Sequence, residues 1–207
     1  MQLIVCSPST KRYIKDFQYD DIMIVTEPPT KDTLKLRDRY HNVIAIGGGS
    51  VIDTAKIICM NSIIAVPTTY SGASGTSHSV YWHNEKKCNI KTKLPMTIIK
   101  EKYARNLPKS VEATSKVDCM SHVIESLVSK NSTEESDKLC MKSIKLIKDG
   151  DWLNASVMAG RAIEITGTNL IHGLSYGITG KYKIPHGIAL SYILNLSDEY
   201  KKVKELL

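Results

Sequence analysis

The fold is decided by the stretch from Val43 to Lys56, which reads VIAIGGGSVIDTAK. An apolar run typical of a buried strand ends in three glycines, and the chain then continues with a helical pattern. Bare backbone N–H groups and a helix N-terminus therefore meet at one point, an arrangement that suits a phosphate group. Glycines also occur where a chain only needs a tight connection. A nucleotide-binding turn and a purely structural turn both fit this stretch.

Short apolar runs rich in β-branched residues recur through the first half of the chain, at residues 3–6, 21–25, 43–46 and 63–66. Polar stretches long enough for a turn and a helix separate them, which is the rhythm of βαβ units. Because the runs are continuous rather than alternating, they indicate strands buried on both faces. The sequence therefore predicts a small parallel sheet flanked by helices, a Rossmann-like α/β fold whose ligands bind at the carboxyl ends of the strands.

The segment after the fourth run, Pro67 to Ser79, is rich in small and hydroxyl-bearing residues. Such a segment can wrap a ligand closely and donate hydrogen bonds to it, and the alternative is a mobile loop. Beyond it, the run Val80–Trp82 predicts one strand of a hairpin. We expect the polar tip of this hairpin at residues 83–87 and its returning strand at Met96–Ile99.

The chain changes character after Leu107 and Pro108, where helical periodicity replaces the short apolar runs. The pattern predicts helices at residues 108–130, 134–148, 151–166 and beyond 169. It contains no convincing strand. We therefore expect a boundary near residue 106, with an α/β domain at residues 1–105 and an all-α domain at residues 106–207.

Composition and charge exclude several classes of function. The chain has 207 residues and a formal net charge of +7. Its lysines are scattered among acidic residues, without an arginine-rich block and with few aromatic residues, which argues against nucleic-acid binding, although the excess charge would attract an anionic cofactor or substrate. Five cysteines without a Cys-x-x-Cys pair predict a reducing, cytoplasmic protein. The run at residues 3–6 is far too short to span a membrane, so no membrane association is expected.

Four residues of the second half could bind a metal ion. Asp118 and His122 are four apart in a predicted helix, so their side chains share one face. His172 and His186 each follow an apolar pair and precede a glycine. One carboxylate and three imidazoles suit Fe(II) or Zn(II) and leave a position for a substrate oxygen. On spacing alone two alternatives stay open, namely a surface pair for Asp118 and His122 and hydrogen-bonded core histidines for the other two.

Four motifs, taken in order, resemble those of the iron-dependent (group III, metal-containing) alcohol dehydrogenase family. They are GGGSVIDTAK at 47–56, Pro-Thr-Thr at 67–69, the run from Asp118 to Glu125, and His172 followed by Ile184-Pro185-His186-Gly187. The resemblance covers most of the chain. It implies an oxidoreductase with a nucleotide-binding domain at 1–105 and a helical, metal-binding domain at 106–207. It also implies that the metal ligands are Asp118, His122, His172 and His186.

The same resemblance places NAD(P)H in the first domain. It implies that the pyrophosphate contacts Gly47, Gly48, Gly49 and Ser50, and that Thr68 and Thr69 flank the nicotinamide end. Asp53 would lie close to the reacting groups, as both a cofactor-binding and a catalytic residue. The structural alternative for Asp53 is that an acid in the first turn of a helix complements the helix dipole.

The chain resembles a shortened member of the family and departs from its pattern in two further places. The segment from Tyr70 to His78 replaces a shorter Gly-Thr-Gly-Ser-Glu, so cofactor contacts there cannot be transferred. Tyr176 stands where many members carry a second histidine. Tyr176 or a chain of water molecules is therefore expected to deliver the proton.

The resemblance implies reversible hydride transfer between NADH or NADPH and a small aldehyde or ketone. The basic charge balance adds phosphate- and phosphonate-bearing carbonyl compounds to the candidates. Two alternatives stay open. One is a sugar-phosphate cyclase similar to dehydroquinate synthase, which uses bound NAD, and the other is a non-catalytic nucleotide-binding scaffold. The expected partners are a small carbonyl or alcohol substrate and a second copy of the chain, because a small helical half leaves apolar surface that a dimer would cover.

Overall fold

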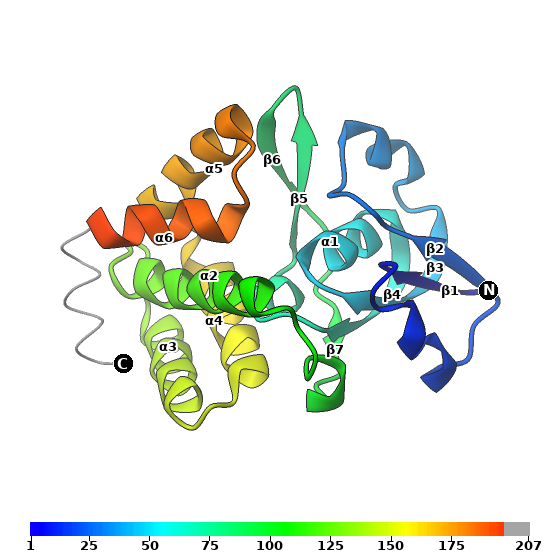
Figure 1. The fold of residues 1–207 in the computed structure, drawn as a ribbon, viewed down its shortest axis with the longest axis horizontal. Coiled ribbons are helices and arrows are strands. Elements are labelled where there is room, and N and C mark those ends of the chain that lie inside the picture. Colours follow the sequence, from blue (N-terminus) through cyan, green and yellow to red (C-terminus); the bar gives the residue numbers. More distant parts are fainter. Residues whose placement is uncertain (197–207) are drawn as a thin grey trace. The chain divides into compact units, whose positions relative to one another are not determined.

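The computed structural model describes residues 1–196, and its contacts divide into two units (Figure 1). The first unit contains Met1–Thr69 and Thr76–Leu107. The second contains Tyr70–Gly75 and the chain from Pro108 onward. Six residues that lie inside the first half of the sequence therefore pack with the second half.

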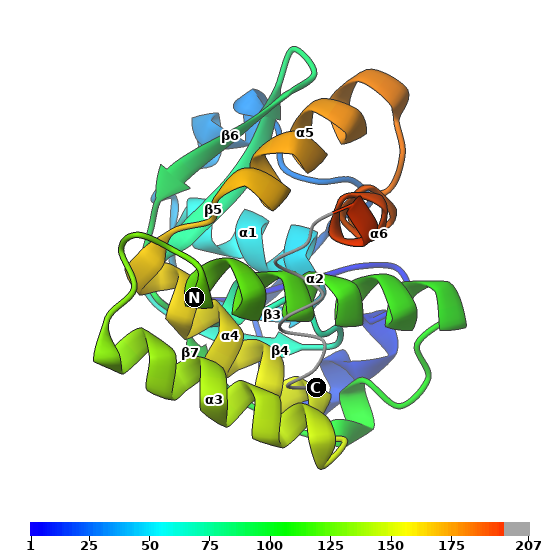
Figure 2. The same ribbon diagram turned by 90° about the vertical axis from the view of Figure 1, so that its left-hand side faces the viewer.

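A five-stranded parallel sheet, in the order β2-β1-β3-β4-β7, forms the centre of the first unit (Figures 1 and 2). Its strands are β1 (Gln2–Cys6), β2 (Asp21–Ile24), β3 (Tyr40–Gly47), β4 (Cys59–Pro67) and β7 (Met96–Thr97). The runs at 3–6 and 43–46 are buried and pair in register, with Ile4 opposite Ile44, whereas the edge strand β2 is partly exposed. The predicted Rossmann-like α/β fold is confirmed.

The connections between the strands are less helical than the sequence predicts. η1 (Lys11–Asp16) and η2 (Lys31–Leu36) are 3-10 helices, and neither contains a buried residue. Helices in proteins are stabilised mainly by burying an amphipathic face, so these segments lack the packing that would extend them. Only α1 (Gly49–Ile58), which connects β3 to β4, is a full α-helix, and seven of its ten residues are buried.

The predicted hairpin is present, but its second strand was wrongly placed. β5 (His78–His83) pairs with β6 (Lys86–Lys91), not with residues 96–99. Asn84 and Glu85 both have positive φ angles, 45° and 63°, which is the geometry of a two-residue hairpin turn. β6 is not predicted from the sequence, because its residues are mostly polar and show little of the apolar pattern of a strand. Met96–Thr97 instead extends the main sheet as β7, parallel to β4.

The second unit is helical throughout the part that the structure describes. Its elements are η3 (Ala73–Gly75), α2 (Lys109–Leu127), α3 (Glu134–Lys148), α4 (Trp152–Thr166), α5 (Leu170–Tyr182) and α6 (His186–Leu196). Capping explains two of the boundaries. The Thr133 side chain accepts a hydrogen bond from the backbone of Ser136 at the start of α3, and Asp151 caps α4 in the same way.

Two apolar clusters form the core of the second unit. One joins α2, α3 and α4 through small side chains such as Cys119, Cys140 and Ala159. The other joins α2, α5 and α6 through Ile124, Ile171 and Leu190. Helix α2 belongs to both clusters, so the residues on its two sides are fixed by packing.

The inserted segment Tyr70–Gly75 packs against α4 at a point where both partners are glycines. A Cβ atom on Gly75 would lie 2.6 Å from the carbonyl oxygen of Val157, and Gly72 has a φ of 78°. Side chains at these positions would push the segment away from Gly160 on α4. The approach therefore depends on glycine on both surfaces.

Candidate functional site

The glycine turn connects β3 to α1 and is shaped by close packing rather than by unusual backbone angles. β3 ends at Gly47, Gly48 caps the helix with a φ of −82°, and α1 begins at Gly49. A Cβ on Gly47 would lie 2.6 Å from the Cβ of Val51. Ser50 is the second residue of α1, so the backbone N–H groups of Gly49 and Ser50 belong to the first helical turn, which has no intrahelical partners for its N–H groups.

Thr68 and Thr69 lie beside this turn, as the neighbouring strand β4 ends there. The backbone N–H of Thr68 donates to the carbonyl oxygen of Gly47 over 3.0 Å. A Cβ on Gly48 would lie 3.1 Å from the methyl carbon of Thr69. The structure thus brings together all six residues that were predicted to hold the cofactor pyrophosphate and nicotinamide end, and the assignment of these roles stays a prediction.

The turn also lies at the switch point of the sheet, where β1 and β3 are neighbours and the connections lead to opposite sides. The loop after β1 contributes hydroxyl groups there, because Thr10 Oγ1 donates to the carbonyl oxygen of Ile46 over 2.7 Å. Sequence reasoning missed this loop. The signal was present in Ser7-Pro8-Ser9-Thr10, a hydroxyl-rich run directly after the first predicted strand.

Asp53 is the fifth residue of α1, and the first turn of this helix contains no acid. The helix-dipole explanation of Asp53 is therefore wrong. Its carboxylate instead pairs with Lys56, with 3.0 Å between Oδ1 and Nζ. Asp53 lies on the same helix as the glycine turn, which is compatible with its predicted place near the reacting groups without testing it.

The four predicted metal ligands converge within the second unit. Asp118 and His122 lie on α2, His172 lies on α5, and His186 is the first residue of α6. The Nε2 atoms of His172, His122 and His186 lie 3.3, 3.6 and 3.9 Å from Asp118 Oδ1. One ligand atom from each of Asp118, His172 and His186 can be chosen so that all lie within 4.8 Å of one another.

The aromatic rings around Asp118 are packed against one another. His122 and His172 stack with 4.6 Å between ring centroids and 9° between planes. Tyr176, one turn after His172 on α5, has its ring 5.5 Å from that of His186. The predicted proton donor is therefore next to the histidine cluster.

Glu125 and Ser175 orient two of the imidazoles. Glu125 is 1% exposed, and its Oε2 lies 2.5 Å from His172 Nδ1. Ser175 Oγ donates to the carbonyl oxygen of His172 over 2.7 Å, so it can accept from His186 Nδ1 at 3.3 Å. With both Nδ1 atoms acting as donors, the Nε2 atoms of His172 and His186 carry the lone pairs that a metal ion needs whenever these imidazoles are neutral.

Glu125 has a second structural role and was missed as a functional residue by the sequence reasoning. Its Oε1 accepts hydrogen bonds from the backbone N–H groups of Ile171 and His172, over 2.6 and 3.1 Å, in the first turn of α5. The signal was its spacing, because Glu125 lies three residues after His122 and seven after Asp118 on one helix. The same carboxylate thus holds the start of α5 and the ring of its third residue.

The charges in the cluster stabilise one another. Burial alone would raise the pKa of Asp118, but positive charge on His122 and the hydrogen bond from His172 hold it well below its usual range. Burial would likewise raise the pKa of Glu125, and the His172 hydrogen bond lowers it. Burial would lower the pKa of His172, whereas its hydrogen bonds to Asp118 and Glu125 raise it. The site favours a positive charge at the imidazoles, which is the charge that a divalent cation would supply there.

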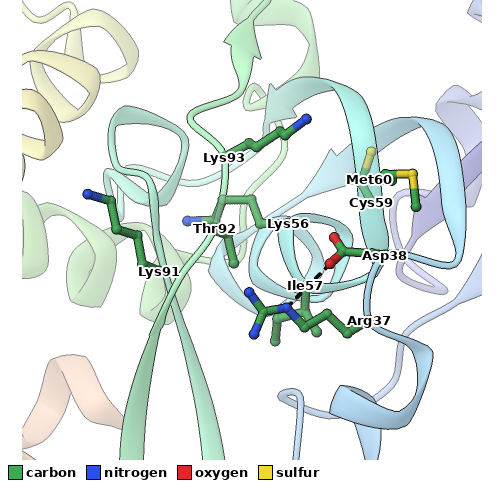
Figure 3. A pocket seen from close by; sticks show the side chains of 9 residues that line it. All are labelled: Arg37, Asp38, Lys56, Ile57, Cys59, Met60, Lys91, Thr92 and Lys93. Atoms are coloured by element: carbon green, nitrogen blue, oxygen red, sulfur yellow. Dashed lines mark ion pairs between the residues drawn. The ribbon is translucent and has the colours of Figure 1, made fainter.

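The first unit contains a pocket of about 330 Å³ whose lining includes no residue of the glycine turn. Figure 3 shows the side chains that line it. The pocket is lined by the last turn of α1 and by Cys59, the first residue of β4, so it lies at the amino ends of the strands. Parallel sheets bind ligands at the opposite ends. The cationic Arg37 at this cavity is already paired with Asp38 over 3.5 Å. The cavity is therefore not part of the cofactor site.

Two further observations concern the described residues as a whole. All five cysteines are free thiols, and four of them are buried. Among residues 1–196, no helix combines the length and the apolar character that crossing a lipid bilayer requires.

Comparison with protein-family models gives two adjoining matches. Residues 10–102 match the model described as iron-containing alcohol dehydrogenase, and residues 112–205 match the C-terminal model of the Fe-containing alcohol dehydrogenase family. Solved structures are similar in fold. An iron-containing alcohol dehydrogenase aligns over 99% of this chain and 75% of its own, with a TM-score of 0.83 and 22% identity. An iron-containing enzyme of Thermotoga maritima gives the same coverage and a TM-score of 0.80 at 22% identity.

Among curated proteins, the 4-hydroxybutyrate dehydrogenase of Clostridium kluyveri is 31% identical over 193 residues, which is 73% of this chain and 52% of that protein. The 1-propanol dehydrogenase of Salmonella typhimurium is 29% identical, over 73% of this chain and 49% of its own. The NAD-dependent methanol dehydrogenase of Bacillus methanolicus is 27% identical, over 72% and 50%. The chain thus spans about half the length of the curated relatives that it matches.

Proposed function

The chain belongs to the iron-containing alcohol dehydrogenase family, and we propose that it interconverts a small aldehyde or ketone and its alcohol by hydride transfer with NADH or NADPH. A divalent metal ion, Fe(II) or Zn(II), would be held by Asp118, His122, His172 and His186. The observation that carries the proposal is the convergence of one carboxylate oxygen and two imidazole nitrogens within 4.8 Å. The names of the relatives described above point to 4-hydroxybutyrate, 1-propanol and methanol, so a phosphate- or phosphonate-bearing substrate is not proposed.

The donor set fits the metal. Carboxylate and neutral imidazole are ligands that both Fe(II) and Zn(II) accept. Glu125 and Ser175 hold His172 and His186 in the tautomers that direct Nε2 toward Asp118. Bound there, the ion supplies Lewis acidity that polarises a carbonyl oxygen, and the nicotinamide supplies the hydride.

The chain's own residues would supply orientation and proton transfer. The backbone N–H groups of the glycine turn would bind the pyrophosphate at the N-terminus of α1. Thr68 and Thr69 would flank the nicotinamide end, and Asp53 would lie near the reacting groups. Tyr176, whose ring lies 5.5 Å from His186, would donate the proton that completes alcohol formation and remove it in the reverse direction.

Two alternatives lead to different measurements. A cyclase similar to dehydroquinate synthase would form product without net change in NAD, whereas a dehydrogenase consumes the cofactor. A non-catalytic scaffold would bind nucleotide without needing a metal ion at Asp118. One equivalent of metal in the purified protein would therefore count against a scaffold. The hydrogen-bonded orientation of His172 and His186 favours a metal-dependent enzyme over a scaffold.

The proposal also extends to assembly and location. Several apolar side chains of α5 and α6 are exposed, among them Leu170, Leu174, Tyr182, Tyr192 and Leu196. A second copy of the chain would cover such a surface, so we propose a homodimer, which sedimentation velocity measures. The free cysteines fit the proposed cytoplasmic setting.

The experiment that tests the function combines metal analysis with a turnover screen. The purified protein is loaded anaerobically with Fe(II) or Zn(II), measured by elemental analysis, and assayed with both nicotinamide cofactors on small aldehydes and, in reverse, on 1-propanol and 4-hydroxybutyrate. We expect one metal per chain and net cofactor turnover. Asp118→Ala should lose metal and turnover together, by about 10³-fold or more in rate. Full activity of this variant would overturn the ligand assignment, and a wild-type protein without metal or turnover would overturn the function.

A further inference from the structure

The side chain of Lys56 on α1 is completely buried, with 0% of its surface exposed. Lysine is rarely buried in this way unless its charge is compensated, because an isolated ammonium loses its hydration. The compensating group is Asp53, one turn earlier on the same helix, whose Oδ1 lies 3.0 Å from Nζ. Neither the proposed reaction nor the glycine turn uses this lysine.

Three further hydrogen bonds of the ammonium lead to one short segment. Nζ donates to the carbonyl oxygen and to the hydroxyl of Thr76, each over 3.4 Å, and to the carbonyl oxygen of His78. Thr76 Oγ1 also donates to the His78 carbonyl over 3.0 Å. Thr76 is the first residue after the chain returns from the second unit. Lys56 therefore binds both the Asp53 carboxylate and the segment Thr76–His78, where the chain re-enters the first unit.

A second Asp–Lys pair shows what burial adds. Asp32 and Lys35 have the same spacing of three residues and lie 2.7 Å apart, but their side chains are 80% and 79% exposed. Exposed pairs of this kind contribute little, because water and salt screen them. The Asp53–Lys56 pair is shielded, so its geometry is held by the surrounding structure and each partner restricts the other.

From these contacts we infer that Lys56 is a positioning residue, which fixes the Asp53 carboxylate and the Thr76–His78 backbone in the arrangement that the reaction requires. This inference rests on the proposed function, because Asp53 is the group through which Lys56 would act. In this role Lys56 would act through Asp53 and would not itself touch substrate or metal. Its removal would leave the glycine turn in place and release the carboxylate three residues before it.

The test compares Lys56→Met, Lys56→Arg, Asp53→Asn and the double variant Asp53→Asn/Lys56→Met, with Lys35→Met as the matched control on an exposed pair. Measured quantities are kcat, KM, the dissociation constant of NADH by fluorescence, and the rate of chymotrypsin cleavage after Tyr70. We expect Lys56→Met to lower kcat by about 10- to 100-fold and to change the NADH dissociation constant by less than about threefold, as the glycine turn stays intact.

The double variant separates positioning from a general structural role. If Lys56 acts through Asp53, the double variant has the kcat of Asp53→Asn alone, whereas independent losses would multiply. Cleavage after Tyr70 should become faster by about tenfold in Lys56→Met and stay unchanged in Lys35→Met, because the return point at Thr76 is loosened. Lys56→Arg, which keeps the charge, should recover part of kcat.

Three outcomes would overturn the inference: a kcat of Lys56→Met within twofold of the wild type, multiplicative losses in the double variant, or failure of both Lys56 variants to fold, which would make the lysine a core residue only. A wild-type protein with no turnover would overturn the proposed function and the inference with it. Wild-type turnover together with an unchanged Lys56→Met overturns the inference alone.

Discussion

Two aspartates of this molecule have the same exposure, 14% of the side chain, but different kinds of positive partner. Asp53 in the first unit is paired with the ammonium group of Lys56. Asp118 in the second unit is surrounded by imidazoles, which are charged only when protonated. The first unit therefore balances its buried charge by itself, whereas the balance of the second depends on pH or on a bound cation.

The largest effect is expected from a substitution of Glu125, which alters the imidazoles around Asp118. In Glu125→Gln the side-chain oxygen still accepts the N–H groups of α5, but the amide now donates to His172 Nδ1. The imidazole must then carry its proton on Nε2, the atom that a metal needs. We expect metal affinity to fall by about 10- to 100-fold, measured by competition with a fluorescent chelator.

The control for this prediction is Ser175→Ala, which removes the acceptor of His186 Nδ1 but forces no tautomer. Its loss of affinity should be smaller than that of Glu125→Gln. Equal affinities of Glu125→Gln and the wild-type protein would contradict the assignment of the tautomers. Metal binding at Asp118 would then not depend on the hydrogen bonds that Glu125 and Ser175 form with the Nδ1 atoms of His172 and His186.

A smaller effect is expected in the first unit, and it should not depend on metal. Gly47→Ala places a Cβ 2.6 Å from that of Val51, so α1 must shift. We expect a loss of about 1–3 kcal/mol in the free energy of unfolding, measured with urea, with and without metal. Gly47→Ala/Val51→Ala should recover part of the loss, because it removes the two methyl carbons of Val51 that lie 2.6 and 2.9 Å from the added Cβ. A destabilisation that disappears when metal is added would contradict the expectation that this effect does not depend on metal.

The smallest effect concerns pH in the metal-free protein. The pKa of His172 is raised on folding, so its contribution to stability is complete below the unfolded value of about 6.5 and is lost as the pH rises through the folded value. The pKa of Asp118 is lowered, so its contribution is present above about 3.9 and is lost as the pH falls. The cluster is therefore most stabilising between about pH 4 and 6.5.

A bound metal should reverse the upper part of this dependence, because it binds neutral imidazoles. Between pH 6 and 8, we expect the melting temperature of the metal-free protein to fall by about 2–4 °C, while the increment due to metal grows. Thermal unfolding in chelator and in excess Zn(II) measures both. Parallel curves would show that His172 does not change its charge in this range.

The sequence allowed much of this fold to be predicted because its main signals are local. The strand, glycines and helix of residues 43–56 adjoin one another, and α3 begins and ends where its capping threonine and its periodicity indicate. The return strand of the hairpin was misplaced because residues 86–91 are mostly polar and carry little apolar pattern. That pairing depends on the turn at Asn84 and Glu85 and not on hydrophobic burial.

The candidate site divides in the same way. Asp118 and His122 can be recognised from their spacing on one helix, and the family motifs supplied His172 and His186. The roles of Glu125, Ser175 and Lys56 depend on contacts that form only when α5, α6 and β5 pack. These contacts join residues of different segments, so no local sequence pattern predicts them. The ligand and cofactor assignments stay predictions until the variants above are measured.

The inserted segment Tyr70–Gly75 has a consequence for how such proteins can be recombined. By contacts it belongs to the helical unit, where Gly72 and Gly75 approach Gly160, but by sequence it lies within the first half. A chimaera joined between Leu107 and Pro108 would take its helices from one relative. It would take the segment Tyr70–Gly75, which packs against α4, from the other. Exchange of the complete helical unit between relatives therefore requires three junctions, which lie before Tyr70, after Gly75 and before Pro108.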